Sequence, residues 1–382
     1  MKKFYSLICM GIVWMLSSYA QEPMPSITVE CAEPGFLTSV ELPADTWSFD
    51  HVFIKGRFST DDLEVVKNAL DGKNINVLNC KDAYFFKGGT QSAWENSVGV
   101  IEDGTYPRNF LGAHTIVMPR TLKRVIAWQG AECRRLMLPD GLERIEQRAF
   151  EWGGVDSLVN MPESIKYIGA GAFYSVSLHT LKMPDDIKII EDTCLYVSKK
   201  LHLPANLEEI SWRGVGFGGE SLTLPDKLRR IGPSGLTGRN LKELHVLAEE
   251  PPFCDNELNA GELHDFYAKT PGPSLLDMDK ANCVLFVPKG TIEKYRAAHE
   301  WGEFVDIREE ADDYVEDMTG FREWENVEKE YSDNASVNGV AIGNEEGLPS
   351  YYDIQGRKTD KPTSGINIMV YPDGTTKKVM VE

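Results

Sequence analysis

The stretch "LPDGLERIEQRAF", residues 138–150, recurs downstream with its proline and two aliphatic residues at constant offsets. The later copies are "MPESIKYIGAGAF", "MPDDIKIIEDTCL", "LPANLEEISWRGV" and "LPDKLRRIGPSGL". With one earlier copy included, the aligned prolines lie 20 to 23 residues apart, at Pro119, Pro139, Pro162, Pro184, Pro204 and Pro225. A fixed period near this length is typical of a solenoid, in which each unit buries its apolar edge against its neighbours.

Each proline is preceded by an apolar alternation that predicts a short strand. Apolar residues lie three and one positions before the proline with variable residues between them, so one strand face points inward. Proline ends the strand because it lacks the N–H that a ladder needs. The aliphatic residues three and six positions after the proline return the chain to the core. We therefore predict that Leu136, Leu138, Leu142 and Ile145 are buried together.

The repeat resembles the BspA-like leucine-rich repeats of surface and secreted proteins from anaerobic bacteria, over roughly residues 105–307. The stretch "LFVPKGTIEKYRAAHEWGEFVDI" resembles the family's terminal unit, with Tyr295, Trp301, Phe304 and Ile307 as its apolar side. Residues 36–83 resemble its leading module, and "HVFIKGRFSTDDLEVVKNALDGKNINVLNC" predicts a strand, a capped helix and a strand. The resemblance implies an α/β solenoid with an N-terminal β-α-β cap and a short β-rich C-terminal tail.

These patterns predict five segments along the chain. They are a signal peptide at 1–20, a capping module at 21–104, the solenoid with its terminal cap at 105–307, an acidic linker at 308–346 and a β-rich module at 347–382. The linker is expected to be solvated, because Arg308 to Asp333 holds 11 acidic and 3 basic residues. Residues 351–382 resemble C-terminal sandwich modules, some of which are secretion-sorting signals, and Pro372-Asp373-Gly374 predicts a hairpin turn. A docked hairpin is the alternative.

The N-terminus has the composition of an export signal. Lys2 and Lys3 precede an apolar run from Phe4 to Leu16, and small residues at Ser18 and Ala20 suit cleavage before residue 21. We expect the mature protein to be secreted, periplasmic or attached to the cell surface; the alternative is a buried N-terminal helix. The apolar run is too short for a membrane span, and no other stretch approaches one. A formal net charge of −19 argues against nucleic acid or anionic membrane as the partner.

Six cysteines remain after this cleavage, and they give only a weak disulfide signal. An even count in an exported chain permits bridges, but the spacings are wide and no CxxC motif occurs. Cys194 occupies a small-residue core position of the repeat, which predicts a buried free thiol. If a bridge forms, Cys254 with Cys283 is the first choice.

The sequence offers little that would support catalysis or a cofactor. "GVGFGG" matches GxGxxG through Gly214, Gly216 and Gly219, but we expect it in a loop between coils with no βαβ unit around it. Surface polar roles are favoured over metal binding for the histidines at or beside strand positions, which are His114, His179, His202 and His245. We predict no catalytic residue, no cofactor and no metal site.

The favoured function is therefore a non-enzymatic binding or adhesion protein, monomeric, that presents its repeats to a protein or glycan partner. One alternative is a carbohydrate-processing accessory or an enzyme with a site near the N-terminal module. Another is a structural protein of the cell envelope. The fold alone does not decide among them.

The binding surface is predicted from strand geometry. Side chains alternate along a strand, so residues four and two positions before each proline point away from the core. This stripe carries three basic residues and, before Glu243, no acidic one. The candidate residues are Thr115, Val117, Arg135, Met137, Leu158, Asn160, Thr180, Lys182, Lys200, His202, Ser221, Thr223, Glu243 and His245.

Overall fold

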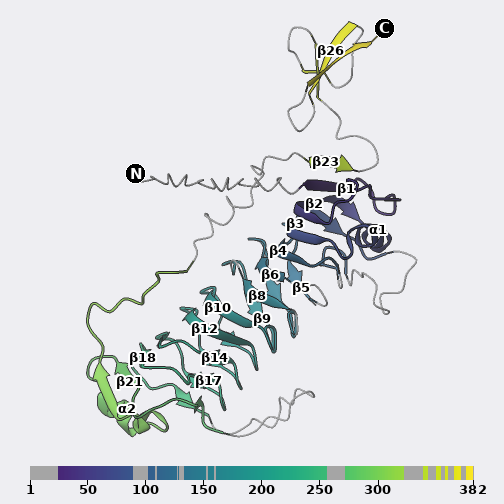
Figure 1. Ribbon diagram of the computed structural model, residues 1–382. Helices are drawn as coiled ribbons and strands as arrows, with labels where there is room; N and C mark the ends of the chain where they lie inside the picture. Colours follow the sequence, from purple (N-terminus) through teal and green to yellow (C-terminus); the bar gives the residue numbers. More distant parts are fainter. Residues whose placement is uncertain are drawn as a thin grey trace, which may run out of the picture.

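Short parallel strands recur once per coil in the computed structural model of the chain, and the coils stack in a single row (Figure 1). The structure describes residues 25–88, 102–107, 110–126, 128, 133–151, 154–158, 161–255 and 272–321, together with the backbone of five C-terminal strands. The predicted signal peptide at 1–20 lies outside these residues.

The first side of the coil is made by the strands that precede the prolines. Neighbouring strands pair in parallel and in register, so that Ile116 lies opposite Leu136 and Leu222 opposite Leu244. The strands are β4 (Ala113–Val117), β6 (Cys133–Met137), β8 (Val155–Leu158), β10 (Ser177–Lys182), β12 (Leu195–His202), β15 (Ser221–Leu224), β18 (Glu243–Val246), β21 (Val284–Val287) and β22 (Asp306–Glu309). We call the outward side of these strands the strand face.

The other two sides are built from still shorter ladders. The second side is formed by two-residue strands, and all but the last contain the aliphatic residue six positions after an aligned proline. They are β5 (Arg124–Val125), β7 (Arg144–Ile145), β9 (Tyr167–Ile168), β11 (Ile189–Ile190), β13 (Glu209–Ile210), β16 (Arg230–Ile231) and β19 (Phe253–Cys254). The third side is a parallel sheet of β10, β12, β14 (Val215–Phe217), β17 (Leu236–Thr237) and β20 (Leu275–Leu276).

The predicted core is confirmed. Leu136, Leu138, Leu142 and Ile145 have no measurable exposure and belong to one continuous hydrophobic cluster. Rings from successive coils also stack along the axis of that cluster. Ring centroids lie between 5.0 and 6.0 Å apart along the series Phe85, Tyr106, Trp128, Phe150 and Phe173.

The coils are a parallel β-solenoid, and the predicted α/β character does not extend to them. Among the described residues, the α-helices are α1 (Thr60–Leu70) near the N-terminus and α2 (Ile292–Ala297) in the terminal unit. The residue before each small core residue has a positive φ, between 49° and 66°, at Arg148, Gly171, Thr193, Arg213 and Ser234. A left-handed residue at this corner of these five coils interrupts any helical turn there.

The N-terminal strands continue the solenoid sheet. The parallel strands β1 (Ser26–Cys31), β2 (Ser48–Phe58) and β3 (Asn74–Phe85) lie side by side, and β3 pairs with β4. Ser59 caps α1 through a capping box with Asp62, as the sequence allows. Asp62 also accepts hydrogen bonds from the backbone N–H groups of Gly35 and Leu37 at 2.6 and 2.9 Å, which fixes the β1–β2 connection on the helix.

The terminal unit closes the other end of the core. The four predicted apolar residues of this unit, Tyr295, Trp301, Phe304 and Ile307, are buried. The polar atoms of the two that carry them are hydrogen-bonded. The Tyr295 hydroxyl donates to the Ala248 carbonyl at 2.6 Å, and Trp301 Nε1 donates to the Pro252 carbonyl at 2.8 Å. A 3-10 turn, Trp301–Glu303, leads from α2 toward β22.

The bridge considered first, Cys254 with Cys283, does not form. The six cysteines of the described residues are buried free thiols, Cys194 among them as predicted. Cys254 belongs to β19 on the second side, whereas Cys283 directly precedes β21 on the first side, so the two lie on different sides of the coil. Burial raises the pKa of both thiols, to about 12 and about 11, which keeps them protonated at neutral pH.

Beyond the solenoid, backbone strands form two further pairings. β23 (Gly339–Ile342), inside the predicted linker, pairs in parallel with β1. A four-stranded antiparallel sheet contains β24 (Ser350–Asp353), β25 (Lys358–Thr359), β26 (Gly365–Val370) and β27 (Thr376–Val381). The antiparallel pairing of β26 with β27 agrees with the hairpin predicted there, whose turn residues 372–374 lie outside the described residues.

Candidate binding site

The strand face aligns the predicted contact residues in two columns over the later coils. Thr180 lies opposite Lys200, and Lys182 opposite His202. In the following pair of strands, Ser221 lies opposite Glu243, and Thr223 opposite His245. The exposed or half-buried members of the predicted set are Arg135, Thr180, Lys182, Lys200, His202, Ser221 and Glu243.

The early coils do not present the surface that the sequence predicts. Thr115, Val117 and Met137 are buried, although they lie in the expected register. Strands in a ladder are only about 4.8 Å apart, so each of these side chains is flanked by side chains of the neighbouring strands. Thr115, for example, lies between Val77 on β3 and Arg135 on β6.

Leu158 does not belong to the strand face. It pairs with Leu136 and is buried in the core, whereas Ser157 takes the outward position opposite Arg135. The interval between Pro139 and Pro162 is the longest in the series, so counting back from the second proline misplaces the strand. Asn160, the other candidate of this copy, lies outside the described residues.

A segment of the same chain covers the strand face over the later coils. Residues 310–321, which we call the acidic strap, follow β22 and run back along the row of coils toward β12 (Figure 1). Most strap residues are exposed, as a solvated linker would be, but Glu310, Tyr314 and Glu316 are partly buried. The strap therefore touches the solenoid at intervals, which its composition does not predict.

The carboxylates at the far end of the strap contact two predicted contact residues. Lys200 Nζ lies 2.7 Å from Asp317 Oδ2 and donates to the Thr319 carbonyl at the same distance. His202 Nδ1 lies 2.8 Å from Glu316 Oε2. Hydrogen bonding from Lys200, reinforced by Thr319, holds the pKa of the Asp317 carboxyl well below its usual range. The charge of Lys200 on the strand face is therefore paired with a carboxylate of the strap.

The near end of the strap is anchored by a stack of rings. His245 is buried between Phe286 and Tyr314, with ring centroids 4.7 and 4.3 Å away and ring planes within 12° of parallel. His245 Nδ1 lies 2.5 Å from Glu310 Oε2, and the Tyr314 hydroxyl lies 2.6 Å from Thr223 Oγ1. His245 and Thr223 are thus buried beneath the strap.

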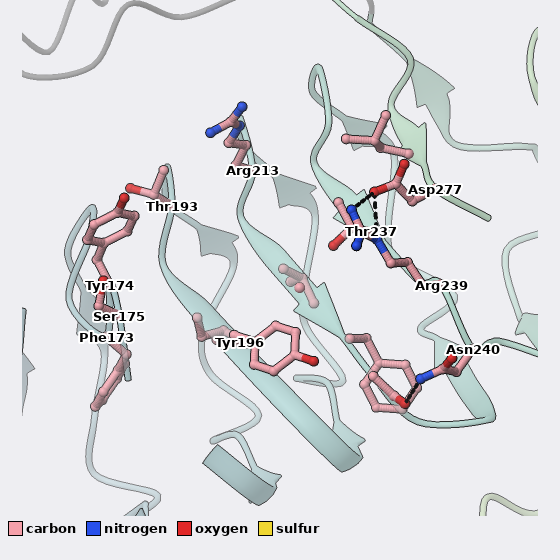
Figure 2. Close-up of a pocket in the computed structure, with 16 residues that line it drawn as sticks. Phe173, Tyr174, Ser175, Thr193, Tyr196, Arg213, Thr237, Arg239, Asn240 and Asp277 are labelled. Carbon is pink, nitrogen blue, oxygen red and sulfur yellow. Dashed lines mark hydrogen bonds and ion pairs between the residues drawn. The ribbon is translucent and has the colours of Figure 1, made fainter. Parts of the chain in front are cut away.

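A second candidate surface lies on the third side of the coil, where a groove of about 610 Å³ opens over β12, β14, β17 and β20. Its floor is one residue from each strand, since Tyr196, Gly216, Thr237 and Leu276 are successive partners in the parallel ladder. Figure 2 shows Tyr174 and Thr193 beyond the Tyr196 end of this row, and Arg239, Asn240 and Asp277 near Thr237 at the other end.

Glycine makes room for the Tyr196 ring. A Cβ atom at Gly216 would lie 2.7 Å from Tyr196 Cδ2, and one at Gly218 would lie 2.9 Å from the Tyr196 hydroxyl. The ring therefore rests on backbone where any other residue would push it away. Tyr196 remains 45% exposed, so part of the ring faces solvent above the groove floor.

Polar groups at the edge of the groove are held in place by the protein. Arg239 makes an ion pair with Asp277 at 2.9 Å, and Asn240 Nδ2 donates to the Gly218 carbonyl at 3.1 Å (Figure 2). Arg213 is exposed at the rim, with its guanidinium carbon 4.8 Å from the centroid of the neighbouring Trp212 ring.

The part of the chain that the structure describes assembles no cluster suited to a metal ion. Within those ranges, no group of three or more His, Cys, Asp and Glu side chains is arranged to hold a metal ion. His202 and His245 each face a strap carboxylate, and His114 Nδ1 lies 3.2 Å from Thr115 Oγ1. None of the helices in the described ranges has the length and apolar character needed to cross a membrane.

Sequence reasoning missed the groove because it placed "GVGFGG" in a loop. Val215–Phe217 is instead strand β14, and Gly216 is its outward residue. The sequence does contain a signal for the groove. Tyr196 in one copy of the repeat and Gly216 in the next occupy equivalent positions, so an aromatic residue is followed by a glycine.

Comparison with known proteins identifies the same repeat and does not identify a binding partner. Residues 126–242 match the model of the BspA type leucine rich repeat region, in six copies. The chain is similar in structure to a leucine-rich repeat protein from Bacteroides ovatus, with 13% identity, a TM-score of 0.34, and coverage of 74% of this chain and 69% of that chain. Among curated proteins, none matches the sequence significantly.

Proposed function

We propose that this chain, in which residues 126–242 are BspA-type leucine-rich repeats, is an exported, non-enzymatic binding protein that holds a protein partner on its strand face. Leucine-rich repeats of this kind are consistent with a role in protein interaction, because stacked repeats give an extended surface. The contact residues lie on the later coils, at Lys182, Lys200, His202, Thr223 and His245.

The observation that carries this proposal is the acidic strap. The strand face already binds an extended peptide segment, using Lys200 and His202 for carboxylates and His245 for an aromatic ring. A partner with acidic residues on either side of a tyrosine would satisfy the same groups. Glu310, Tyr314 and Glu316 of the strap then occupy the places of the partner's side chains.

The strap and such a partner would compete. A tethered segment has a high effective concentration at its own site, so an external partner binds only when the strap is released. The apparent affinity of the partner falls by the fraction of molecules in which the face is free. The protein would therefore bind weakly while the strap is docked and more tightly once it is released.

Competition can be tested with a fluorescent peptide of residues 308–321 and the full chain. A released variant carries Tyr314→Ala, Glu316→Gln and Asp317→Asn, which remove the ring and two carboxylates from the strap. We expect the peptide to bind the released variant at least roughly tenfold more tightly than the unmodified chain, because the tethered competitor is weakened.

Two further variants locate the peptide. Lys200→Glu in the released background should abolish binding, since the carboxylate of Asp317 would meet a like charge. Lys188→Glu changes a more exposed lysine that pairs with Glu208 away from the strand face, so it is the control and should bind normally. Equal binding by both variants, or no binding by the released chain, would place the partner elsewhere.

Export is a separate part of the proposal. The basic start, apolar run and small residues before Gln21 support cleavage after Ala20. Mass spectrometry of the natively produced protein should find Gln21 at its N-terminus, and an intact Met1 would contradict export by this signal. A secretion-sorting role for residues 347–382 and an adhesive role at the cell surface stay predictions.

A further inference from the structure

The groove on the third side of the coil has a different chemistry from the strand face, and we propose that it is a saccharide-binding site. An oligosaccharide would lie across β12, β14, β17 and β20 with one sugar ring stacked on Tyr196. This inference is independent of the protein partner, because the groove shares no residue with the strap contacts.

The platform for the sugar is the Tyr196 ring. A pyranose ring presents a face of C–H groups with hydroxyls around its edge, and such a face packs on an exposed aromatic ring. Tyr196 is held flat for this contact, because Gly216 and Gly218 leave its ring on the strand backbone. The ring loses little conformational freedom on binding, since it is already positioned in the free protein.

Hydrogen-bonding groups line the groove beside the platform. Thr237 is the second neighbour of Tyr196 in the ladder, and Asn240, Arg239 and Asp277 line one side of the groove. The ion pair orients Arg239 and Asp277, and the bond to Gly218 orients the Asn240 amide. Planar carboxylate, amide and guanidinium groups can each contact two neighbouring hydroxyls at once.

The size and direction of the groove suit more than one sugar ring. Its volume of about 610 Å³ falls within the range of small-ligand sites, roughly 300–1,000 Å³. From Tyr196 to Leu276 the floor crosses four strands, or three strand spacings, which is about 14 Å. The row of floor residues runs perpendicular to the strands, so the ligand would follow the axis of the solenoid.

An extended peptide suits this groove less well. Peptides commonly join a sheet by pairing with a free strand edge. Here β14 and β17 are interior strands whose backbone groups are paired on both sides. A ligand over β14 and β17 must therefore bind through side chains there, and those available are the exposed Tyr196 ring and several groups that bond hydroxyls. A polyhydroxylated ligand satisfies both kinds of group.

The test is an array of defined neutral and acidic oligosaccharides probed with the full chain, with affinities then measured by calorimetry. We expect at least one oligosaccharide to bind the unmodified chain and to lose at least roughly tenfold in affinity in Tyr196→Ala, because the stacking surface is removed. Tyr196→Phe should bind within a few-fold of the unmodified chain, because it keeps the ring.

Other variants test whether the effect of Tyr196→Ala is specific to this ring or follows from the loss of any exposed aromatic side chain. Phe253→Ala removes an exposed aromatic from β19 on the second side and should bind normally. Gly216→Ala should weaken binding even though Tyr196 is intact, because the added methyl displaces the ring. Thermal unfolding of each variant confirms that the fold is retained.

Three outcomes would overturn the saccharide site. One is that no oligosaccharide binds the unmodified chain. Another is that Tyr196→Ala and Phe253→Ala bind alike. The third is loss of saccharide binding in the charge variant Lys200→Glu, which would move the site to the strand face. Failure of peptide binding in the released variant has no bearing on these measurements, so the two proposals are tested separately.

Discussion

The Tyr314 ring lies parallel to the His245 imidazole, with centroids 4.3 Å apart and planes 12° apart. His245 is a strand residue of the solenoid, and Tyr314 belongs to the acidic strap. The stack therefore joins the solenoid to a segment that its composition predicts to be a solvated linker. The Tyr314 hydroxyl adds a contact with Thr223 on the neighbouring strand, and burial raises the pKa of that hydroxyl. The ring is therefore one apolar anchor of the strap, and Phe321, whose ring centroid lies 6.3 Å from that of His202, is another.

Replacing Tyr314 with alanine should release the strap while leaving the solenoid folded. An aromatic stack of this kind contributes about 0.5–1.5 kcal/mol, so the equilibrium constant for docking of the strap should fall by roughly two- to tenfold. Hydrogen exchange followed by mass spectrometry should show faster exchange in residues 310–321. The protection of β12, β15 and β18 should stay unchanged.

Two control variants separate the ring from other effects of substitution. Tyr314→Phe keeps the stack on His245 and loses only the contact with Thr223, so exchange should rise slightly. Val315→Ala changes a strap side chain that is exposed to solvent and should leave exchange unaltered. Similar exchange in Tyr314→Ala and Val315→Ala would show that the ring does not anchor the strap.

Asp317 should titrate below the ordinary aspartate range as long as Lys200 is present. The folded pKa is lowered, so the ion pair stabilises the docked strap above the unfolded value of about 3.9 and is lost as the pH falls through the lower folded value. Carbon-13 NMR of the Asp317 carboxyl should follow this midpoint.

Lys200→Met tests the cause of that shift. Without the ammonium, the Asp317 midpoint should return toward about 3.9, and the docked strap should become less sensitive to salt. Lys188→Met is the control, because its partner is Glu208 rather than the strap. An unchanged midpoint in Lys200→Met would show that Thr319 alone determines the pKa of Asp317.

The repeat could be predicted from the sequence because its determinants are local. Pro139, Leu142 and Ile145 lie within one unit, and the constant spacing indicates which side of each strand is buried. The prediction was wrong at Leu158, because the extra length before Pro162 shifts the strand relative to the proline. Periodicity thus locates the core well and gives the outer register only where the unit length is constant.

The strap and the groove depend on information that no short window contains. Lys200 and Asp317 are 117 residues apart, and an acidic segment that contacts its own solenoid has the same composition as a solvated linker. The groove depends on Tyr196 and Gly216 being neighbours across two coils. That relationship is visible in the repeat alignment only after the strands are assigned.

Leu142→Ala should be strongly destabilising because it leaves a cavity in the continuous core. Leu142 is fully buried, and comparable truncations cost roughly 2–5 kcal/mol. Denaturant unfolding followed by circular dichroism measures the change. Ile189→Ala, at an exposed position of β11, should cost much less. A loss below about 0.5 kcal/mol for Leu142→Ala would contradict the assigned core.

The corner of the coil can be tested with two substitutions at equivalent positions of successive repeats. One introduces a glycine and the other removes one, so we expect opposite effects on stability. Thr193 and Gly171 both have positive φ, 49° and 66°, and both precede a small core residue. A left-handed backbone costs a residue with a Cβ about 1–2 kcal/mol, whereas glycine loses about 0.5–1 kcal/mol more in chain entropy. Thr193→Gly should therefore stabilise the protein by about 0.5 kcal/mol.

Gly171→Val should do the reverse at the equivalent corner. A β-branched side chain is disfavoured at positive φ, and its Cβ would lie 3.2 Å from Arg148 Cγ, so we expect a loss of about 1–2 kcal/mol. Both free energies of unfolding can be measured by denaturant titration against the unmodified chain. If Thr193→Gly instead lost more than about 1 kcal/mol, contacts of the Thr193 side chain would outweigh the backbone conformation at this corner.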